Sequence, residues 1–408
     1  MQLLRHAAME TILFAGLTVS SPAQQPPAPR IMDRTAPDVD LTSSDVDLTS
    51  PDGTRLRATF FPAAKPGPGV LLLHQCNRQR KVWDDLARKL SASGLNVLTV
   101  DFRGFGQSAG TPLDKLTPEQ IQEVFDKKFP SDVDTAYSYL ASQASVTPSI
   151  MAAGGASCGV NQSVLLASRR PEVKALVLLS EGTGRPGREF LRKNPNLPLF
   201  AAVADDDPDP GVVEFMEWIY SFSANPIDKF GHFPKGGHGV ELFDLHKDLP
   251  GDIVSWLDNA LSAHPAVPPT RAPILAERRN HFLDQVDQPG GPARGAQLFA
   301  EAQKQSPKEV IFTEPIVNRL GYEYLQAGDI KSSIDLFKLN VTAYPDSPNV
   351  YDSLGDAYLA NGQTDLARKN AQKTLDLLSK YTKYPEDFAK GLRENALKKL
   401  ALPVSPSH

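Results

Sequence analysis

Short, continuous apolar runs that alternate with helical patterns are the feature that most limits how this chain can fold. Each run has the length of a strand and keeps apolar residues at consecutive positions, which is typical of a strand buried on both faces. The segments between the runs repeat apolar residues with a helical period, as at Trp83, Leu86 and Leu90. Because alternating strands and helices build parallel sheets covered on both faces, an α/β domain is predicted. The clearest runs are 69–74, 95–101, 149–154, 173–180 and 198–204.

Further elements are expected around these runs. An edge strand is predicted at 56–61, a weaker last strand at 226–234, and one closing helix over 240–261. Only about seventeen residues separate the run 173–180 from the run 198–204. This leaves no room for a large lid, so a fairly open site with specificity set by short loops is expected.

The composition changes after a Pro-rich segment, HPAVPPTRAP, and apolar residues then recur with a helical period. In this second part RLGYEYLQAGD returns as SLGDAYLANGQ, with matching residues 34 positions apart. This period resembles the tetratricopeptide repeat, in which helix pairs stack through small and aromatic residues. We therefore predict a small all-α tetratricopeptide-like domain whose concave surface is a candidate for binding a protein partner. The matching pairs are Gly321 with Gly355, Tyr324 with Tyr358, and Gly328 with Gly362.

The N-terminal segment resembles a secretory signal. Basic Arg5 precedes the apolar run 11–19, and Ser21-Pro22-Ala23 offers a small-x-small cleavage site. The apolar run is too short to span a bilayer, so export to the periplasm or the extracellular space is expected. The expected boundaries are a signal peptide at 1–23, a disordered segment at 24–44, the α/β domain at 45–262, a Pro-rich linker at 263–292, and the helical domain at 293–402.

The overall composition argues against several classes of function. A net charge of −5 gives no reason to expect nucleic acid or an anionic membrane as a partner. No later segment reaches the 18 or so apolar residues of a membrane span. We find no metal-ligand cluster, no Walker loop and no dinucleotide fingerprint in the sequence, so no cofactor and no metal are expected. Two cysteines are too few for a disulfide-framework scaffold.

The stretch GGASCGVNQ places two candidate nucleophiles side by side, Ser157 and Cys158. A strand is predicted before it and a helix after it, so the nucleophile would sit in a sharp, strained turn. The residues two before and two after such a nucleophile must be very small. Around Ser157 these residues are Gly155 and Gly159, whereas Cys158 would have the β-branched Val160 on one side. The spacing therefore favours Ser157.

At this point the chain resembles the α/β-hydrolase fold, in particular its dienelactone-hydrolase-like and small esterase-like or peptidase-like branches. A strand ends in His74, a loop, a helix and a strand follow, and Asp101–Ser108 then matches the pattern D-x-R-G-x-G-x-S. Gln75 departs from the pattern, because the family has glycine after this histidine. The resemblance extends over roughly 45–260, and it implies that His74 and Asp101–Ser108 shape loops beside the site.

The resemblance also implies that an acid and then a histidine follow the serine along the chain. An acid is expected in the turn after the run 198–204, where Asp207 is the preferred residue and Asp205 and Asp206 are close rivals. Glu181, at the end of the preceding run, is another position from which an acid could reach the same histidine.

His238 is the preferred base, because its glycine neighbours in KGGHG let a loop bring an imidazole close to the serine. His232, at the end of the weak last strand, is the alternative. In this interpretation Ser157 attacks an acyl carbonyl, His238 accepts its proton, and Asp207 orients the imidazole.

The oxyanion hole is expected to use the backbone N–H of Cys158 together with that of Gln75 or Cys76. The only two cysteines then fall in the two segments that build this hole. Two interpretations stay open, a disulfide between Cys76 and Cys158 in an oxidising compartment, or two small buried thiols.

The leading hypothesis is a serine hydrolase that cleaves carboxylic esters or related acyl bonds in small or medium substrates. A serine exopeptidase of the same fold is one alternative, since a fold does not fix the bond that is cut. A non-catalytic scaffold that binds proteins through its repeats is the other.

Overall fold

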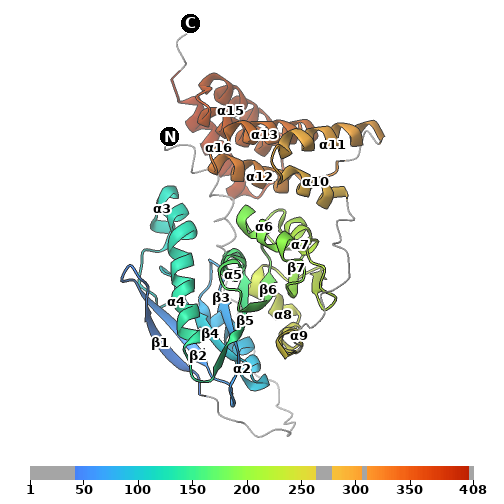
Figure 1. The fold of residues 1–408 in the computed structure, drawn as a ribbon. Coiled ribbons are helices and arrows are strands. Elements are labelled where there is room, and N and C mark those ends of the chain that lie inside the picture. The colour runs from blue at the N-terminus through green and yellow to red at the C-terminus, as the bar shows by residue number, and fades with distance from the viewer. Residues whose placement is uncertain (1–41, 263–277, 306–309, 404–408) are drawn as a thin grey trace, which may run out of the picture.

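The computed structural model describes residues 42–262, 278–305 and 310–403, with a mainly parallel sheet next to a layer of C-terminal helices (Figure 1). Within these residues the sheet has eight strands in the order β1-β2-β4-β3-β5-β6-β7-β8. The pairs β1–β2 and β2–β4 are antiparallel, and every pair from β4 to β8 is parallel. The strands are β1 Ser44–Thr49, β2 Arg55–Phe61, β3 Gly67–Leu73, β4 Asn96–Val100, β5 Val146–Ala156, β6 Val173–Leu179, β7 Leu199–Ala204 and β8 Lys229–Phe233.

All the apolar runs of the first part form strands, and their side chains alternate between two cores. In β3, Leu71 and Leu73 pack toward α4 and α5, whereas Val70 and Leu72 pack toward α2 and α9. This alternation follows from the two-residue period of a strand. Continuous apolar sequence thus reflects a sheet that is covered on both faces. The covering helices are α2 Asp84–Ser93, α4 Phe129–Ala141, α5 Cys158–Arg169, α7 Val212–Tyr220 and α9 Leu249–Ser262.

The expected single helix over 240–261 is wrong. The structure has a 3₁₀ turn at Gly239–Glu241, a short α8 at Leu242–Leu245, and then α9, which begins at Leu249. Pro250 explains the restart, because proline lacks the N–H that a helix interior needs and is tolerated in the first turn. In the described part of the α/β domain, α3 at Pro118–Glu123 and α6 at Arg185–Lys193 were not expected.

The helical part starts earlier than expected, because α10 at Arg278–Val286 lies inside the expected linker 263–292. Phe282, Leu283 and Val286 are buried on one side of this helix, so the segment packs as part of the core. The expected signal peptide, 1–23, lies outside the described residues, as do 24–41 and 263–277.

The C-terminal helices form antiparallel pairs. α12 packs on α13, and α14 packs on α15. Gly321 of α12 allows close approach, since a Cβ there would lie 2.4 Å from the Phe337 ring. The starts of equivalent helices are 34 residues apart, as in the sequence repeat. The helices are α11 Gly291–Gln305, α12 Glu314–Gln326, α13 Ile330–Ala343, α14 Pro348–Ala360, α15 Thr364–Leu378 and α16 Glu386–Leu400.

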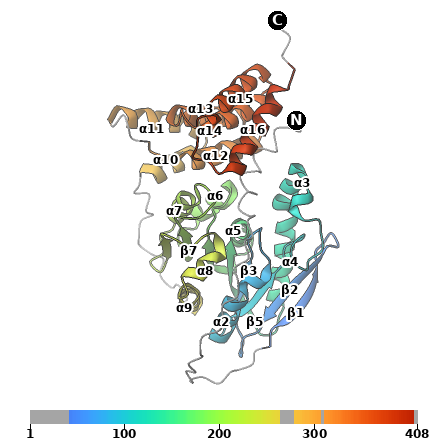
Figure 2. The ribbon, with the colours of Figure 1, turned by 180° about the vertical axis from the view of Figure 1, so that it is seen from behind.

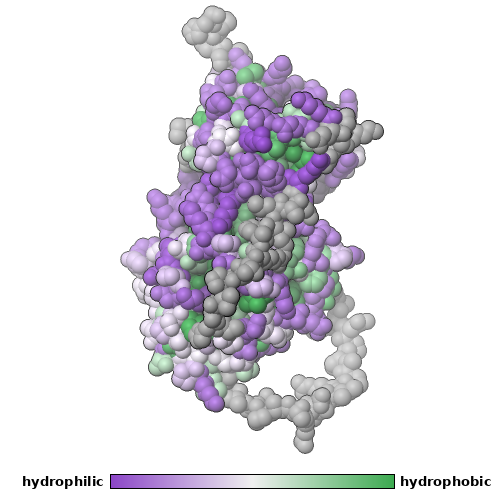
Figure 3. All heavy atoms as spheres, turned by 45° about the vertical axis from the view of Figure 1, so that its right-hand side comes forward, coloured by the Kyte–Doolittle hydropathy of each residue, from purple (hydrophilic) through white to green (hydrophobic). Residues whose placement is uncertain are grey.

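The two parts share one continuous apolar core. Figures 1 and 2 both show α10 and α12 beside α6 and α7. Phe215 and Trp218 of α7 belong to the same buried cluster as Phe282 of α10 and Ile316 of α12. Figure 3 shows one side of the junction between the α/β part and the helical part, where hydrophilic residues gather. In the described part of the chain, no helix is both long and apolar enough to cross a bilayer.

Candidate active site

Ser157 sits in a strained turn between β5 and α5. Its φ is 50°, in the left-handed region that side chains rarely adopt, and its N–H donates to the Leu179 carbonyl at 2.9 Å. A Cβ on Gly155 would lie 2.1 Å from the Gly159 oxygen, and one on Gly159 would lie 2.3 Å from the Leu73 oxygen. Only glycine fits at either position, which gives the spacing around Ser157 its physical reason.

His238 and Asp207 meet beside this turn. The Nδ1 of His238 lies 2.9 Å from both carboxylate oxygens of Asp207, and both side chains are buried. The loop of His238 reaches the serine turn, since a Cβ on Gly239 would lie 3.3 Å from Cβ of Ala156. The Ser157 hydroxyl forms no hydrogen bond with another described residue, and in free enzymes such bonds often form only when substrate binds.

The three neighbouring aspartates have three different partners. Asp206 accepts hydrogen bonds from the backbone N–H groups of Gly236 and Gly237 and so braces the loop of His238. Asp205 bonds the ring of His232 at 2.6 Å on the exposed side of β8. Asp207 alone of the three contacts His238.

The surroundings of His238 favour its charged form. Burial by itself lowers the pKa of His238, but the hydrogen bond and charge of Asp207 outweigh it. The charges of Asp209 and Glu181 act in the same direction as Asp207. The pKa of His238 therefore lies above its usual value of 6.5.

Glu181 does not contact His238 through a hydrogen bond. It lies just beyond the end of β6, where its carboxylate pairs with the guanidinium of Arg319 at 2.7 Å. Asp209 is a further carboxyl of this cluster, and burial followed by the charge of Glu181 raises its pKa to about 7. Arg319 comes from α12, so a side chain of the helical part lies beside the loops after β6 and β7.

Gln75 anchors one loop of the site to another. Its side-chain oxygen accepts a hydrogen bond from the Val240 N–H at 2.9 Å, and its amide approaches the His238 carbonyl at 3.5 Å. A glycine at this position could make neither contact. Gln75, where the family pattern has glycine, therefore ties the loop after β3 to the loop of His238.

Cys76 and Cys158 are joined by a disulfide, with their Cα atoms 5.8 Å apart. This confirms the first of the two interpretations of the cysteines. Cys158 is the first residue of α5, so its N–H has no acceptor within the helix. The bond holds this N–H next to the loop that carries Gln75 and Cys76.

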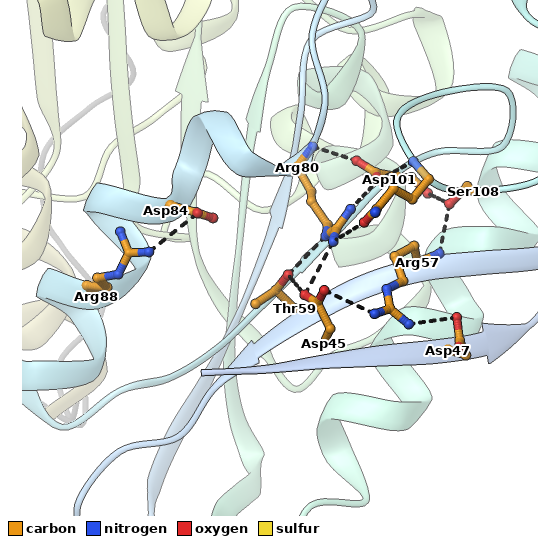
Figure 4. Close-up of polar contacts among 10 residues, drawn as sticks. Asp45, Asp47, Arg57, Thr59, Arg80, Asp84, Arg88, Asp101 and Ser108 are labelled. Atoms are coloured by element: carbon orange, nitrogen blue, oxygen red, sulfur yellow. Dashed lines mark hydrogen bonds and ion pairs between the residues drawn. The ribbon is translucent and has the colours of Figure 1, made fainter. Parts of the chain in front are cut away.

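His74 and the segment Asp101–Ser108 have structural roles, as expected. The ring of His74 donates from Nδ1 to the Gln75 carbonyl and accepts at Nε2 from the Phe102 N–H, and burial lowers its pKa to about 4. Figure 4 shows Asp101 bonded to buried Arg80, and Ser108 in contact with the backbone of Arg57. This network orders the loops behind the site.

Sequence reasoning missed Arg319 and Asp209. Asp209 lies in the same acidic turn as Asp207, so the sequence indicated where it lies along the chain. Nothing in the sequence indicated that its side chain is buried. Arg319 lies in the repeat segment, where nothing in the sequence points to the site. In the ranges that the structure describes, no cluster of His, Cys, Asp or Glu could hold a metal ion.

Comparison with known proteins points to one fold. The family model described as "Serine aminopeptidase, S33" matches residues 64–193. An uncharacterized protein of Mycobacterium tuberculosis is 34% identical over 134 residues, which is 32% of this chain and 43% of that protein. A thiohydrolase of Aspergillus aculeatus, aneE, is 22% identical over 49% of this chain and 60% of its own length. The matches thus span less than two thirds of these relatives.

Solved structures with similar folds include an esterase of Pyrococcus furiosus and a thioesterase domain from the curacin biosynthetic pathway. The esterase is 19% identical, with a TM-score of 0.43 over 57% of this chain and 99% of the esterase. The thioesterase domain is 15% identical, with a TM-score of 0.41 over 53% of this chain and 99% of the domain. The strand order, the family match and the serine turn together give the first part of this chain the α/β-hydrolase fold, followed by an all-α C-terminal part.

Proposed function

We propose that this chain is a serine hydrolase that cleaves carboxylic esters, or related acyl bonds, in small or medium-sized substrates. One observation carries the proposal: a buried His238–Asp207 hydrogen bond stands beside a serine held at a φ of 50°. A strained serine at the end of a strand, followed by a helix N-terminus, is the arrangement that presents a hydroxyl to a substrate.

The proposed reaction begins when Ser157 Oγ attacks the acyl carbonyl and His238 Nε2 accepts the hydroxyl proton. Asp207 holds the proton on Nδ1 and stabilises the imidazolium that forms. When the tetrahedral intermediate breaks down, His238 gives the proton to the leaving group, and an acyl-enzyme remains on Ser157. Water, activated by His238, then releases the acid.

The proposed oxyanion hole consists of the backbone N–H of Cys158 and an N–H of the loop after β3, from Gln75 or Cys76. Charge develops on the carbonyl oxygen in the transition state, and fixed N–H dipoles stabilise it there. The disulfide and the Gln75 contacts support this assignment, because they hold the two loops together.

A fluorophosphonate probe tests the proposal, since it reacts covalently with an activated serine. We expect the label on Ser157 and its loss in Ser157→Ala. Ser180 is the matched control, because among the described residues it is the other non-glycine residue with a φ of 50°. Ser180→Ala should keep the label. An unlabelled but folded wild-type protein would favour a non-catalytic scaffold.

A serine exopeptidase is the second candidate, favoured by the match to the family described as serine aminopeptidase. Hydrolysis of p-nitrophenyl acetate compared with an aminoacyl anilide separates the two functions. We expect the ester to be hydrolysed much faster than the anilide. Faster hydrolysis of the anilide would instead favour the exopeptidase.

We also propose that the protein is exported and that its C-terminal part is tetratricopeptide-like. The disulfide supports export, because such bonds persist in oxidising compartments. The 34-residue offset between equivalent helices supports the repeat assignment. The proposed substrate is a small molecule, and a protein partner on the repeats is the accompanying hypothesis.

A further inference from the structure

The loop after β7 leads to a close contact with the start of α12, and the loop after β6 is packed on α7. Gly211 follows the acidic turn with a φ of 84°, and a Cβ there would lie 3.1 Å from Pro315 Cβ. Gly182, next to Glu181, is pressed against Phe215, since a Cβ there would lie 1.6 Å from the ring. The turn that carries Asp207 thus leads directly into a close contact with the helical part, and the segment after Glu181 is packed on α7.

Arg319 reaches from α12 into this packed region. Its guanidinium pairs with Glu181 at 2.7 Å and lies over the Phe215 ring, 4.7 Å from the centroid. The Glu181 side chain is 11% exposed and that of Arg319 is 32% exposed, so the pair is only partly screened by water. Glu181 also accepts a hydrogen bond from the Gly182 N–H at 2.6 Å, which fixes the carboxylate in place.

Negative charge collects around His238 from several elements. Asp207 and Asp209 come from the turn after β7, Glu181 comes from the end of β6, and Glu241 accepts a hydrogen bond from the His238 N–H. Glu241 is paired with Arg78 at 2.8 Å. Arg319 pairs with Glu181, and although burial lowers the pKa of Arg319, the charges of Glu181, Asp209 and Glu323 outweigh it.

We infer that Arg319 is a positioning residue of the active site: by holding Glu181 in an ion pair, the helical part balances the negative charge around His238, whose imidazole is hydrogen-bonded to Asp207. This inference rests on the proposed role of His238 as the general base. A general base must be uncharged to accept a proton, and each unpaired carboxylate nearby stabilises its charged form. On this view, the C-terminal helices complete the hydrolase site.

The test follows the titration of His238 by NMR in protein that carries Ser157→Ala, and follows kcat/KM against pH in protein with the serine intact. Asp209→Asn is present throughout, so that a second carboxyl near Arg319 does not titrate in the same range. Arg319→Gln should move the His238 titration to higher pH. The ratio of kcat/KM at pH 6 to kcat/KM on the high-pH plateau should be about threefold or more lower in this variant than in the parent protein. Arg319→Lys, which keeps the charge, should restore most of the wild-type behaviour.

Two further variants separate charge from packing. Arg319→Gln combined with Glu181→Gln removes both charges of the pair and should return the titration to its original position. Arg185→Gln breaks a contact of the same junction, the pair with Asp287, without touching Glu181, and should leave the titration unchanged. Thermal unfolding checks that each variant is folded.

Each outcome is decisive. Equal His238 titrations in the Arg319→Gln, Arg185→Gln and parent proteins would overturn the inference. A shift in Arg319→Gln that Glu181→Gln does not reverse would also overturn it, because the effect would then come from packing. The NMR measurement needs no turnover. A protein that fails to react with a fluorophosphonate would refute the proposed function, and the effect of Arg319 on the His238 titration could still be measured.

Discussion

Three neighbouring aspartates in the acidic turn after β7 have different partners because their side chains point in different directions. Asp205 faces exposed His232, Asp206 faces two backbone N–H groups, and Asp207 faces buried His238. In the sequence the three are adjacent and chemically identical. Geometry alone therefore selects Asp207, and substitutions at neighbouring positions provide matched comparisons.

Asp207→Asn should lower kcat/KM for an ester substrate by about 10³- to 10⁴-fold, because an amide cannot hold His238 in the required tautomer. Asp205→Asn is the control, since it changes a neighbouring carboxylate on the solvent side. It should retain activity within about twofold. Equal losses in the two variants would show that the turn as a whole, rather than the Asp207 carboxylate, matters.

In the proposed mechanism, the pH dependence of the reaction follows from His238. Its pKa is raised above 6.5, chiefly because the contact with Asp207 outweighs burial. A protonated base cannot accept the serine proton, so kcat/KM should be full above this pKa and fall as the pH drops through it. We expect the midpoint of the acidic limb above pH 6.5 in a pH–rate profile. A midpoint well below this value would exclude His238 as the controlling group.

At the scale of elements, the strand–turn–helix unit β5–Ser157–α5 depends on close backbone contacts. β3, β5 and α5 meet where Gly155 and Gly159 leave no space for a side chain. The disulfide then links the start of α5 to the loop after β3. Close packing at the glycines and the covalent bond between the cysteines therefore both hold α5 against the end of β3.

Gly155→Ala should destabilise the protein by about 3 kcal/mol or more, because its Cβ would collide with the backbone of Gly159 and Val160. Gly251 in α9 is the control, since it is exposed and a Cβ there meets nothing within 4 Å. Gly251→Ala should leave stability unchanged or increase it by up to about 1 kcal/mol. Urea unfolding of the three proteins gives the comparison, and a mild effect at Gly155 would mean that the turn can relax.

Replacing both cysteines by serine should lower the free energy of unfolding by about 2 to 5 kcal/mol, since the bond closes a long loop with a sequence separation of 82. Thiol titration of the native wild type should find no free thiol without reductant. Two reactive thiols in the native protein would contradict the structure at this point.

Across the full fold, the sequence predicted the strands and helices that follow from the local period of apolar residues. It did not predict contacts between residues that lie far apart along the chain. The apolar runs around Leu71 and Leu178 identified strands because burial on both faces leaves a continuous pattern. The pairing of Arg319 with Glu181 left no such trace, because it joins segments that meet only after the helical part has packed. The helix α10 was missed because Pro-rich sequence precedes it and its apolar face is short.

The shared core predicts that the α/β part does not behave as a separate domain. A chain ending at residue 262 would lose Phe282 and Ile316, which belong to the same buried cluster as Phe215 and Trp218 of α7. We expect this truncated chain to aggregate in size-exclusion chromatography, since a large apolar patch becomes exposed. The intact chain should unfold in a single thermal transition. A monomeric, active truncation would show that the junction is dispensable.

In the proposed mechanism, the bond between Cys76 and Cys158 also determines when the two amide donors of the oxyanion hole become ordered. Without the bond, the two proposed amide donors would belong to separate loops, and their motion would have to be arrested each time a substrate bound. With the bond, that loss of conformational entropy occurs once, when the chain is oxidised. Every later substrate then meets donors that are already preorganised, so the proposed stabilisation of the transition state depends on the earlier oxidation of two thiols.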